Sequence, residues 1–176
     1  MNDRTPTAIV RCSAMVIRDR DILLCKHQDD TWVLPGGTPR EGENAGSCVR
    51  REILEETGLD VEPDRIAFVL DASDPNSHQH LLEIIFTVYE QHRSQQPRTM
   101  ETNLIPCFHP LNKLRELSMR PPIAGYLLGH ILSWSRLGFP RWETAAYLGN
   151  VWRTPDQTAA STLQAPIDTI DRLEPK

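Results

Sequence analysis

The chain has 176 residues, of which 39% are hydrophobic and 24% are charged, and its formal net charge is −5. This length suits one ordinary domain with its own core, and the composition excludes disordered, collagen-like and coiled-coil chains. The longest uncharged stretch, residues 121–135, contains proline, glycine and histidine and is shorter than the about 20 apolar residues of a membrane-spanning helix. We therefore expect no membrane-spanning segment.

Apolar runs separated by turn residues predict the elements of the first third of the chain. Residues 8–18 and 22–25 are rich in apolar and β-branched side chains, and the polar turn between them predicts a β-hairpin. Residues 32–34 predict a third strand, which Pro35-Gly36-Gly37 ends. A helix is predicted from the N-cap Asn44 to Thr57, with Gly58 at the left-handed position that ends a helix.

Strands and helices also follow each other in the rest of the chain. The predicted strands are residues 61–70, 81–89, 104–109 and 144–152, and the predicted helices are residues 110–117 and 123–137. This order predicts an α/β fold with a mixed β-sheet between helices. One domain is expected over residues 1–153, followed by a weakly ordered tail, residues 154–176, in which Thr, Gln, Asp, Ala and Pro dominate.

The N-terminal residues, the cysteines and the net charge limit where the protein is expected to act and which partners it is expected to bind. Residues 1–7 are polar and lack the apolar core of a signal peptide, so a cytoplasmic location is expected. The four cysteines lie far apart without paired metal-ligand spacing, which predicts free thiols. The net charge of −5 argues against binding of a nucleic acid polymer through a basic face.

Three glutamates lie on one side of the predicted helix. Because each helical residue advances by about 100°, Glu52, Glu55 and Glu56 share an arc of roughly 100°. Cys48 and Val49 lie on the same side, so the acids continue the face that is expected to be buried. Such a cluster suits a hard divalent cation, Mg²⁺ or Mn²⁺, whereas an ordinary exposed acidic face is the alternative on these three residues alone.

The surrounding residues match a known motif. The segment from Gly37 to Leu59 matches every fixed position of the Nudix box, Gly-x5-Glu-x7-Arg-Glu-U-x-Glu-Glu-x-Gly-U, in which U is apolar. The chain therefore resembles Nudix hydrolases. The resemblance continues in Trp32-Val33-Leu34-Pro35-Gly36 before the box and in Phe108-His109-Pro110-Leu111 after it, and it implies the family's α/β/α sandwich with a mixed β-sheet.

The resemblance implies a metal site and a catalytic base. Glu52, Glu55 and Glu56 would coordinate Mg²⁺, with Mn²⁺ as the alternative cofactor. The base would be Glu52 or Glu56, or, as in some family members, an acid on a loop after the box. Glu101, in the polar segment before the strand at residues 104–109, is the candidate for that variant, and Glu83 is a weaker one.

Four further residues of the box have implied structural roles. Arg51 would orient an acid by ion pairing with Glu43. Gly37 would permit the loop to enter the helix, and Gly58 would end it.

The family reaction is attack by water on a diphosphate bridge. For this chain the resemblance implies a small-molecule substrate, a nucleoside diphosphate derivative of the nucleotide-sugar or ADP-ribose type. A nucleoside triphosphate pyrophosphatase that removes damaged nucleotides stays open, as does a non-catalytic nucleotide-binding regulator. Homodimers are frequent in the family, and residues 147–152 are expected either to form an interface strand or to close the chain's own sheet.

Side chains outside the box are weaker candidates, because an ordinary surface or packing role is the commoner explanation for each of them. Those considered for contacts with substrate phosphates or a base are Lys26, His27, Trp32, His78, His80, Arg120 and Arg136. Trp142 and Trp152 are expected to pack the C-terminal segment.

Overall fold

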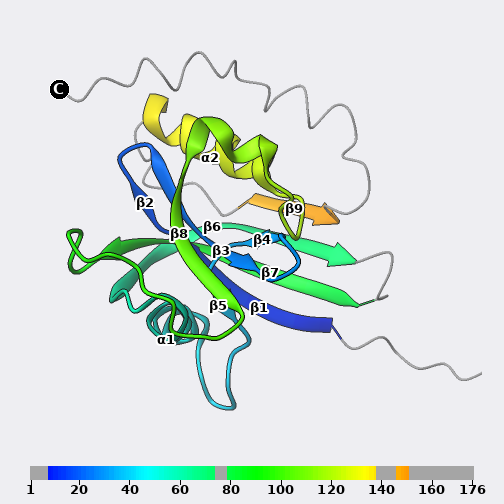
Figure 1. Cartoon of the computed structure of the whole chain (residues 1–176). Helices are drawn as coiled ribbons and strands as arrows, with labels where there is room; N and C mark the ends of the chain where they lie inside the picture. The colour runs from blue at the N-terminus through cyan, green and yellow to red at the C-terminus, as the bar shows by residue number, and fades with distance from the viewer. Residues whose placement is uncertain (1–7, 74–78, 138–145, 151–176) are drawn as a thin grey trace, which may run out of the picture.

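Two β-sheets form the centre of the fold, with a helix on either side (Figure 1). The computed structural model describes residues 8–73, 79–137 and 146–150. The larger sheet has the strand order β5-β1-β7-β6-β9, and its strands are β1 (Ala8–Met15), β5 (Gly36–Gly37), β6 (Val61–Ser73), β7 (His80–Glu90) and β9 (Ala146–Asn150). The pairs β1–β7 and β6–β9 are parallel, whereas β1–β5 and β6–β7 are antiparallel, so the predicted mixed sheet is confirmed.

The smaller sheet is antiparallel and is organised around β3. Its strands are β2 (Ile17–Arg18), β3 (Asp21–His27), β4 (Trp32–Val33) and β8 (Leu104–Pro110). The predicted hairpin of residues 8–18 with residues 22–25 is therefore wrong for most of its first arm, because Ala8–Met15 belongs to the larger sheet. Cys12, Ala14 and Met15 are at most 2% exposed, and a strand covered on both faces suits the interior of a sheet.

Helix α1 (Ala45–Thr57) confirms the predicted helix and its two caps. The Ser47 N–H donates to the Asn44 side chain at 2.9 Å, which satisfies one of the open N–H groups of the first turn. Gly58 adopts φ 73°, and its N–H donates to the Leu54 carbonyl at 3.0 Å. The buried face of α1 packs on one side of the larger sheet, in a cluster with Cys12, Ala14, Leu59, Val61 and Phe86.

The opposite side of the larger sheet is covered by the smaller sheet and by the remaining helices. A short 3₁₀ helix (Leu111–Glu116) and α2 (Ala124–Leu137) confirm the two predicted helices. They pack into a second apolar cluster, whose members include Leu24, Leu70, Ile85, Leu114, Ile123 and Leu127. Within the described residues, no helix combines the length and the apolar character that a membrane crossing requires.

Residues 147–152 are expected from the sequence to form either an interface strand or a strand of the chain's own sheet. β9 pairs in parallel with β6, so this segment extends the chain's own sheet. The α/β fold expected from the sequence is confirmed. The predicted domain boundary at residue 153 and the tail at residues 154–176 lie outside the described residues, as does His78.

Candidate functional site

The three glutamates of α1 lie in three different environments. The Glu56 residue is 5% exposed, whereas the side chains of Glu52 and Glu55 are 16% and 40% exposed. Because they lie on one helical arc, the acidic face runs from the core to the surface over a single turn. Glu56 thus lies at the buried end of the acidic face and Glu55 at its exposed end.

Glu56 is held by the glycine turn that precedes the helix. The Gly36 N–H donates to Glu56 Oε2 at 2.9 Å. Burial raises the pKa of Glu56 to about 7, the charge of Arg11 opposes the rise, and the charges of Glu52 and Glu101 add to it. Glu56 is therefore a carboxyl that holds or releases a proton near neutral pH in the metal-free protein.

Arg51 ties the other acids together. Its Nε and Nη2 lie 2.8 Å from Glu43 Oε1 and Oε2, and its Nη1 lies 2.7 Å from Glu52 Oε1 and 3.0 Å from Glu55 Oε2. The hydrogen bonds from Arg51, followed by that from the Arg40 N–H, lower the pKa of Glu43 to about 2. The predicted pairing of Arg51 with Glu43 is present, and it keeps Glu43 ionised at neutral pH.

Two adjacent glycines allow the backbone to approach these acids. A Cβ atom on Gly37 would lie 2.6 Å from Glu52 Oε2 and would overlap the rest of that carboxylate. Gly36 has φ 150°, and a Cβ atom there would lie 2.6 Å from Ser13 Cα. Side chains at either position would therefore displace Glu52 or the β1 backbone.

The donor set of this face suits a hard divalent cation. It offers carboxylate oxygens, which Mg²⁺ and Mn²⁺ prefer to nitrogen or sulfur. In the part of the chain that the structure describes, no three His, Cys, Asp or Glu side chains are arranged to hold a metal ion. Arg51 pairs with Glu52 and Glu55, and the Gly36 N–H donates to Glu56, so a bound metal ion would have to replace these partners of the carboxylates.

Glu101 lies on the loop before β8, at the end of α1. The Leu104 N–H donates to its carbonyl at 3.3 Å, and the residue is exposed. The charge of Glu101 contributes to the raised pKa of Glu56, so the two acids lie within electrostatic range of each other. Arg98 N–H donates to the Thr57 carbonyl at 2.8 Å and thereby fixes the loop on the C-terminal turn of α1.

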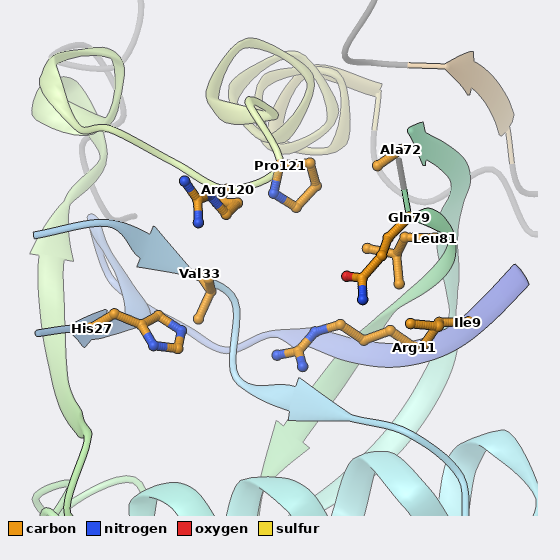
Figure 2. A pocket seen from close by; sticks show the side chains of 9 residues that line it. All are labelled: Ile9, Arg11, His27, Val33, Ala72, Gln79, Leu81, Arg120 and Pro121. Carbon is orange, nitrogen blue, oxygen red and sulfur yellow. The ribbon is translucent and has the colours of Figure 1, made fainter. Parts of the chain in front are cut away.

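A cavity of about 210 Å³ lies on the face of the larger sheet that is opposite α1. Figure 2 shows its lining from β1, β3, β4, β6, β7 and the loop before α2, which contributes Arg120 and Pro121. His27 and Arg120, both candidates from the sequence, lie in this lining. Arg11 was missed by the sequence analysis, although a lone arginine among the apolar residues of β1 was a usable signal.

The other weak candidates have different surroundings. His80 Nε2 lies 2.6 Å from Asp71 Oδ1, and Lys26 Nζ lies 2.6 Å from Asp30 Oδ1. Trp32 makes an edge contact with the ring of His109. None of these contacts joins the acidic face of α1. The side chains of Arg136, Trp142 and Trp152 lie outside the described part of the chain.

The mixed sheet, the glycine entry at residues 36–37 and the glutamate face of α1 together define a domain of the Nudix class. The family model described as NUDIX domain matches residues 9–128, which is more than half of the chain. The protein therefore belongs to the NUDIX family.

Curated relatives are named for one substrate class. The chain is 37% identical over 118 residues to "Putative ADP-ribose pyrophosphatase YjhB" of Bacillus subtilis (strain 168), covering 65% of this chain and 55% of that protein. It is 32% identical over 81 residues to "ADP-ribose pyrophosphatase" of Methanocaldococcus jannaschii, covering 44% and 48%. The chain thus spans about half the length of these curated relatives.

A solved structure supports the fold. The crystal structure of an ADP-ribose pyrophosphatase from Streptococcus suis 89-1591 matches with a TM-score of 0.64 at 24% identity. The match covers 80% of this chain and 99% of that chain. The two proteins therefore share the same arrangement of sheets and helices.

Proposed function

We propose that the protein is a divalent-metal-dependent pyrophosphohydrolase that cleaves the diphosphate bridge of a nucleoside diphosphate derivative, with ADP-ribose as the leading substrate. The observation that carries this proposal is the acidic face of α1, on which Glu56 is buried against the Gly36 turn while Glu52 and Glu55 are held by Arg51. The names of the two curated relatives support the choice of ADP-ribose.

In this proposal Glu52, Glu55 and Glu56 hold Mg²⁺, or alternatively Mn²⁺. When bound, the metal neutralises the charge of the diphosphate and lowers the pKa of a bound water. Arg51 keeps the carboxylates close together in the absence of metal, because each like-charged pair on neighbouring turns is otherwise destabilising. Glu43 in turn anchors Arg51 through two hydrogen bonds.

The proton of the attacking water needs an acceptor. Glu52 and Glu56 are candidates on the helix, and Glu101 is the candidate on the loop. Glu101 is exposed, and among the described residues Arg51 pairs with Glu43, Glu52 and Glu55 but not with Glu101, so Glu101 is available to accept a proton from the attacking water. Glu83 does not fit this role, because it is 2% exposed and lies on the opposite side of the sheet from α1.

The test is phosphate-product release from a panel of ADP-ribose, nucleotide sugars, nucleoside triphosphates and dinucleoside polyphosphates, with Mg²⁺ or Mn²⁺. Wild type is compared with Glu55→Gln and with Glu62→Gln, an exposed glutamate that pairs with Arg50 away from the acidic face. We expect turnover of ADP-ribose that is lost in Glu55→Gln and retained in Glu62→Gln.

Other results would redirect the proposal. Turnover restricted to nucleoside triphosphates would replace the substrate class by that of a nucleotide-sanitising pyrophosphatase. Nucleotide binding without any turnover, unchanged in Glu55→Gln, would replace the enzyme by a nucleotide-binding regulator.

A further inference from the structure

A buried carboxylate lies next to the cavity and has no place in the proposed reaction. Glu83 of β7 is 2% exposed. Its Oε1 accepts a hydrogen bond from the Ser13 hydroxyl, and its Oε2 has no hydrogen-bond partner among the described residues. Burying a carboxyl group costs free energy unless its partners compensate for the lost hydration. If this position served packing alone, an apolar side chain would fill it at a lower cost.

The neighbour of Glu83 is the arginine that lines the cavity. Arg11 stands opposite Glu83 in the parallel pairing of β1 with β7, and its Nε lies 3.7 Å from Glu83 Oε1. Leu81, two residues before Glu83 on β7, also lines the cavity, so this face of the sheet forms its floor. Glu83 therefore points to the same face of the sheet as Leu81 and Arg11, and it lies buried beside the cavity lining.

The Arg11 side chain has polar contacts on two sides and is still partly exposed to solvent. Its Nη2 donates to the Leu34 carbonyl at 3.0 Å, while the Glu83 carboxylate faces Nε. A quarter of the side chain, 25%, is exposed. Figure 2 shows the side chain extending from β1 toward the side of the cavity that His27 and Val33 line.

Arg11 also connects the cavity with the acidic face. The Leu34 carbonyl that it binds lies two residues before Gly36, whose N–H holds Glu56. Arg11 is therefore bonded to the same turn, residues 34–36, that holds Glu56 of the acidic face.

Resting on the proposed function, we propose that Arg11 binds a phosphate group of the nucleotide substrate, and that Glu83 together with Ser13 is the positioning pair that orients the Arg11 guanidinium. A guanidinium presents a planar fork of donors that matches phosphate oxygens, and the fork is useful only when its orientation is fixed. The buried Glu83 carboxylate supplies that orientation from beside Arg11, where it is not itself part of the cavity lining.

The test measures binding without metal and without turnover. Affinities for ADP and for adenosine are measured by calorimetry in EDTA for wild type, Arg11→Gln, Glu83→Gln, Ser13→Ala and Arg50→Gln. Arg50 is the matched control, because it is an exposed arginine of α1 that pairs with Asp60 and Glu62. Thermal unfolding of each variant is recorded in parallel.

We expect wild type to bind ADP more tightly than adenosine. Arg11→Gln weakens ADP binding by about tenfold or more, the size of a lost hydrogen bond to a charged group, and leaves adenosine binding unchanged. Glu83→Gln acts in the same direction by about threefold or more, because it leaves the guanidinium without its charged neighbour. Ser13→Ala, which perturbs the core less, shows the same selective loss at a smaller size, and Arg50→Gln matches wild type.

Three results would overturn the inference. The first is that wild type binds ADP no more tightly than adenosine. The second is that Arg11→Gln retains the wild-type affinity for ADP. The third is that Glu83→Gln and Ser13→Ala lower the melting temperature but leave ADP binding as in wild type, which would mean that Glu83 only stabilises the fold. These results are independent of the hydrolysis panel, so a failed inference and a failed enzymatic proposal are distinguishable.

Discussion

Replacing Gly37 by alanine should slow the proposed hydrolysis strongly while lowering the stability of the fold only a little. The new Cβ would lie 2.6 Å from Glu52 Oε2, whereas ordinary contacts of such an atom begin at 3.4 Å. The carboxylate must therefore move by roughly 0.8 Å or more, and misplacing a group by about 1 Å near a reacting centre costs on the order of 100-fold in rate. Because the Glu52 side chain is partly exposed and can shift toward solvent, the stability loss should stay below about 1.5 kcal/mol.

Gly46 provides the matched control within the same motif. A Cβ atom there meets nothing closer than Asn44 Oδ1 at 3.5 Å, and the residue lies inside α1. Because Gly46 is the second residue of α1, where helical preference counts less than in the interior, Gly46→Ala should retain activity and gain no more than about 0.5 kcal/mol of stability. The assay is the initial rate of ADP-ribose hydrolysis with Mg²⁺, combined with chemical denaturation. Retention of the wild-type rate to within about threefold in Gly37→Ala would refute the argument from Glu52 placement.

Three further predictions concern stability and pH. Gly36→Ala should lose about 2 kcal/mol or more in denaturation experiments, because the added Cβ strains a φ of 150° and overlaps the β1 backbone. Because the folded pKa of Glu43 is lowered to about 2, its contribution to stability is present above its unfolded pKa of 4.5 and is lost as the pH falls toward 2. The difference in melting temperature between wild type and Glu43→Gln should therefore be largest above pH 5, and a pH-independent difference would contradict this reasoning. Because the folded pKa of Glu56 is raised to about 7 in the metal-free protein, a proton competes with Mg²⁺ there, so the thermal stabilisation by Mg²⁺ should increase from pH 6 to pH 8 and this increase should be smaller in Glu56→Gln.

The acidic helix was predictable because its determinants are local. The side chain of Asn44, the left-handed turn at Gly58 and the spacing of the three glutamates all operate within a few residues of one another. The same holds for Arg51, which reaches Glu52 and Glu55 within one turn of α1. A helical period and two caps therefore determine most of this site without knowledge of the sheet.

Pairings between distant strands were not predictable in the same way. Residues 8–18 look like one arm of a hairpin, but the chain leaves the larger sheet after Met15 and only Ile17 and Arg18 pair with β3. A parallel pair such as β1 with β7 leaves no turn signal in the sequence, because its strands are joined through other elements. The contact of Arg11 with Glu83 depends on that pairing, so sequence alone could not show that Glu83 is buried next to a cavity arginine.

The loop before β8 shows how distant residues complete the end of α1. The last carbonyls of a helix lack partners within it; here Arg98 N–H bonds to Thr57 at 2.8 Å and Gln95 Nε2 to Gly58 at 2.6 Å. The Gln95 carbonyl in turn accepts a bond from Arg18 of the smaller sheet at 2.6 Å. The loop is therefore anchored to both the helix and the smaller sheet before it reaches Glu101. The loop and the C-terminal turn of α1 thus satisfy each other's polar groups, so the position of Glu101 is coupled to that of the helix carboxylates.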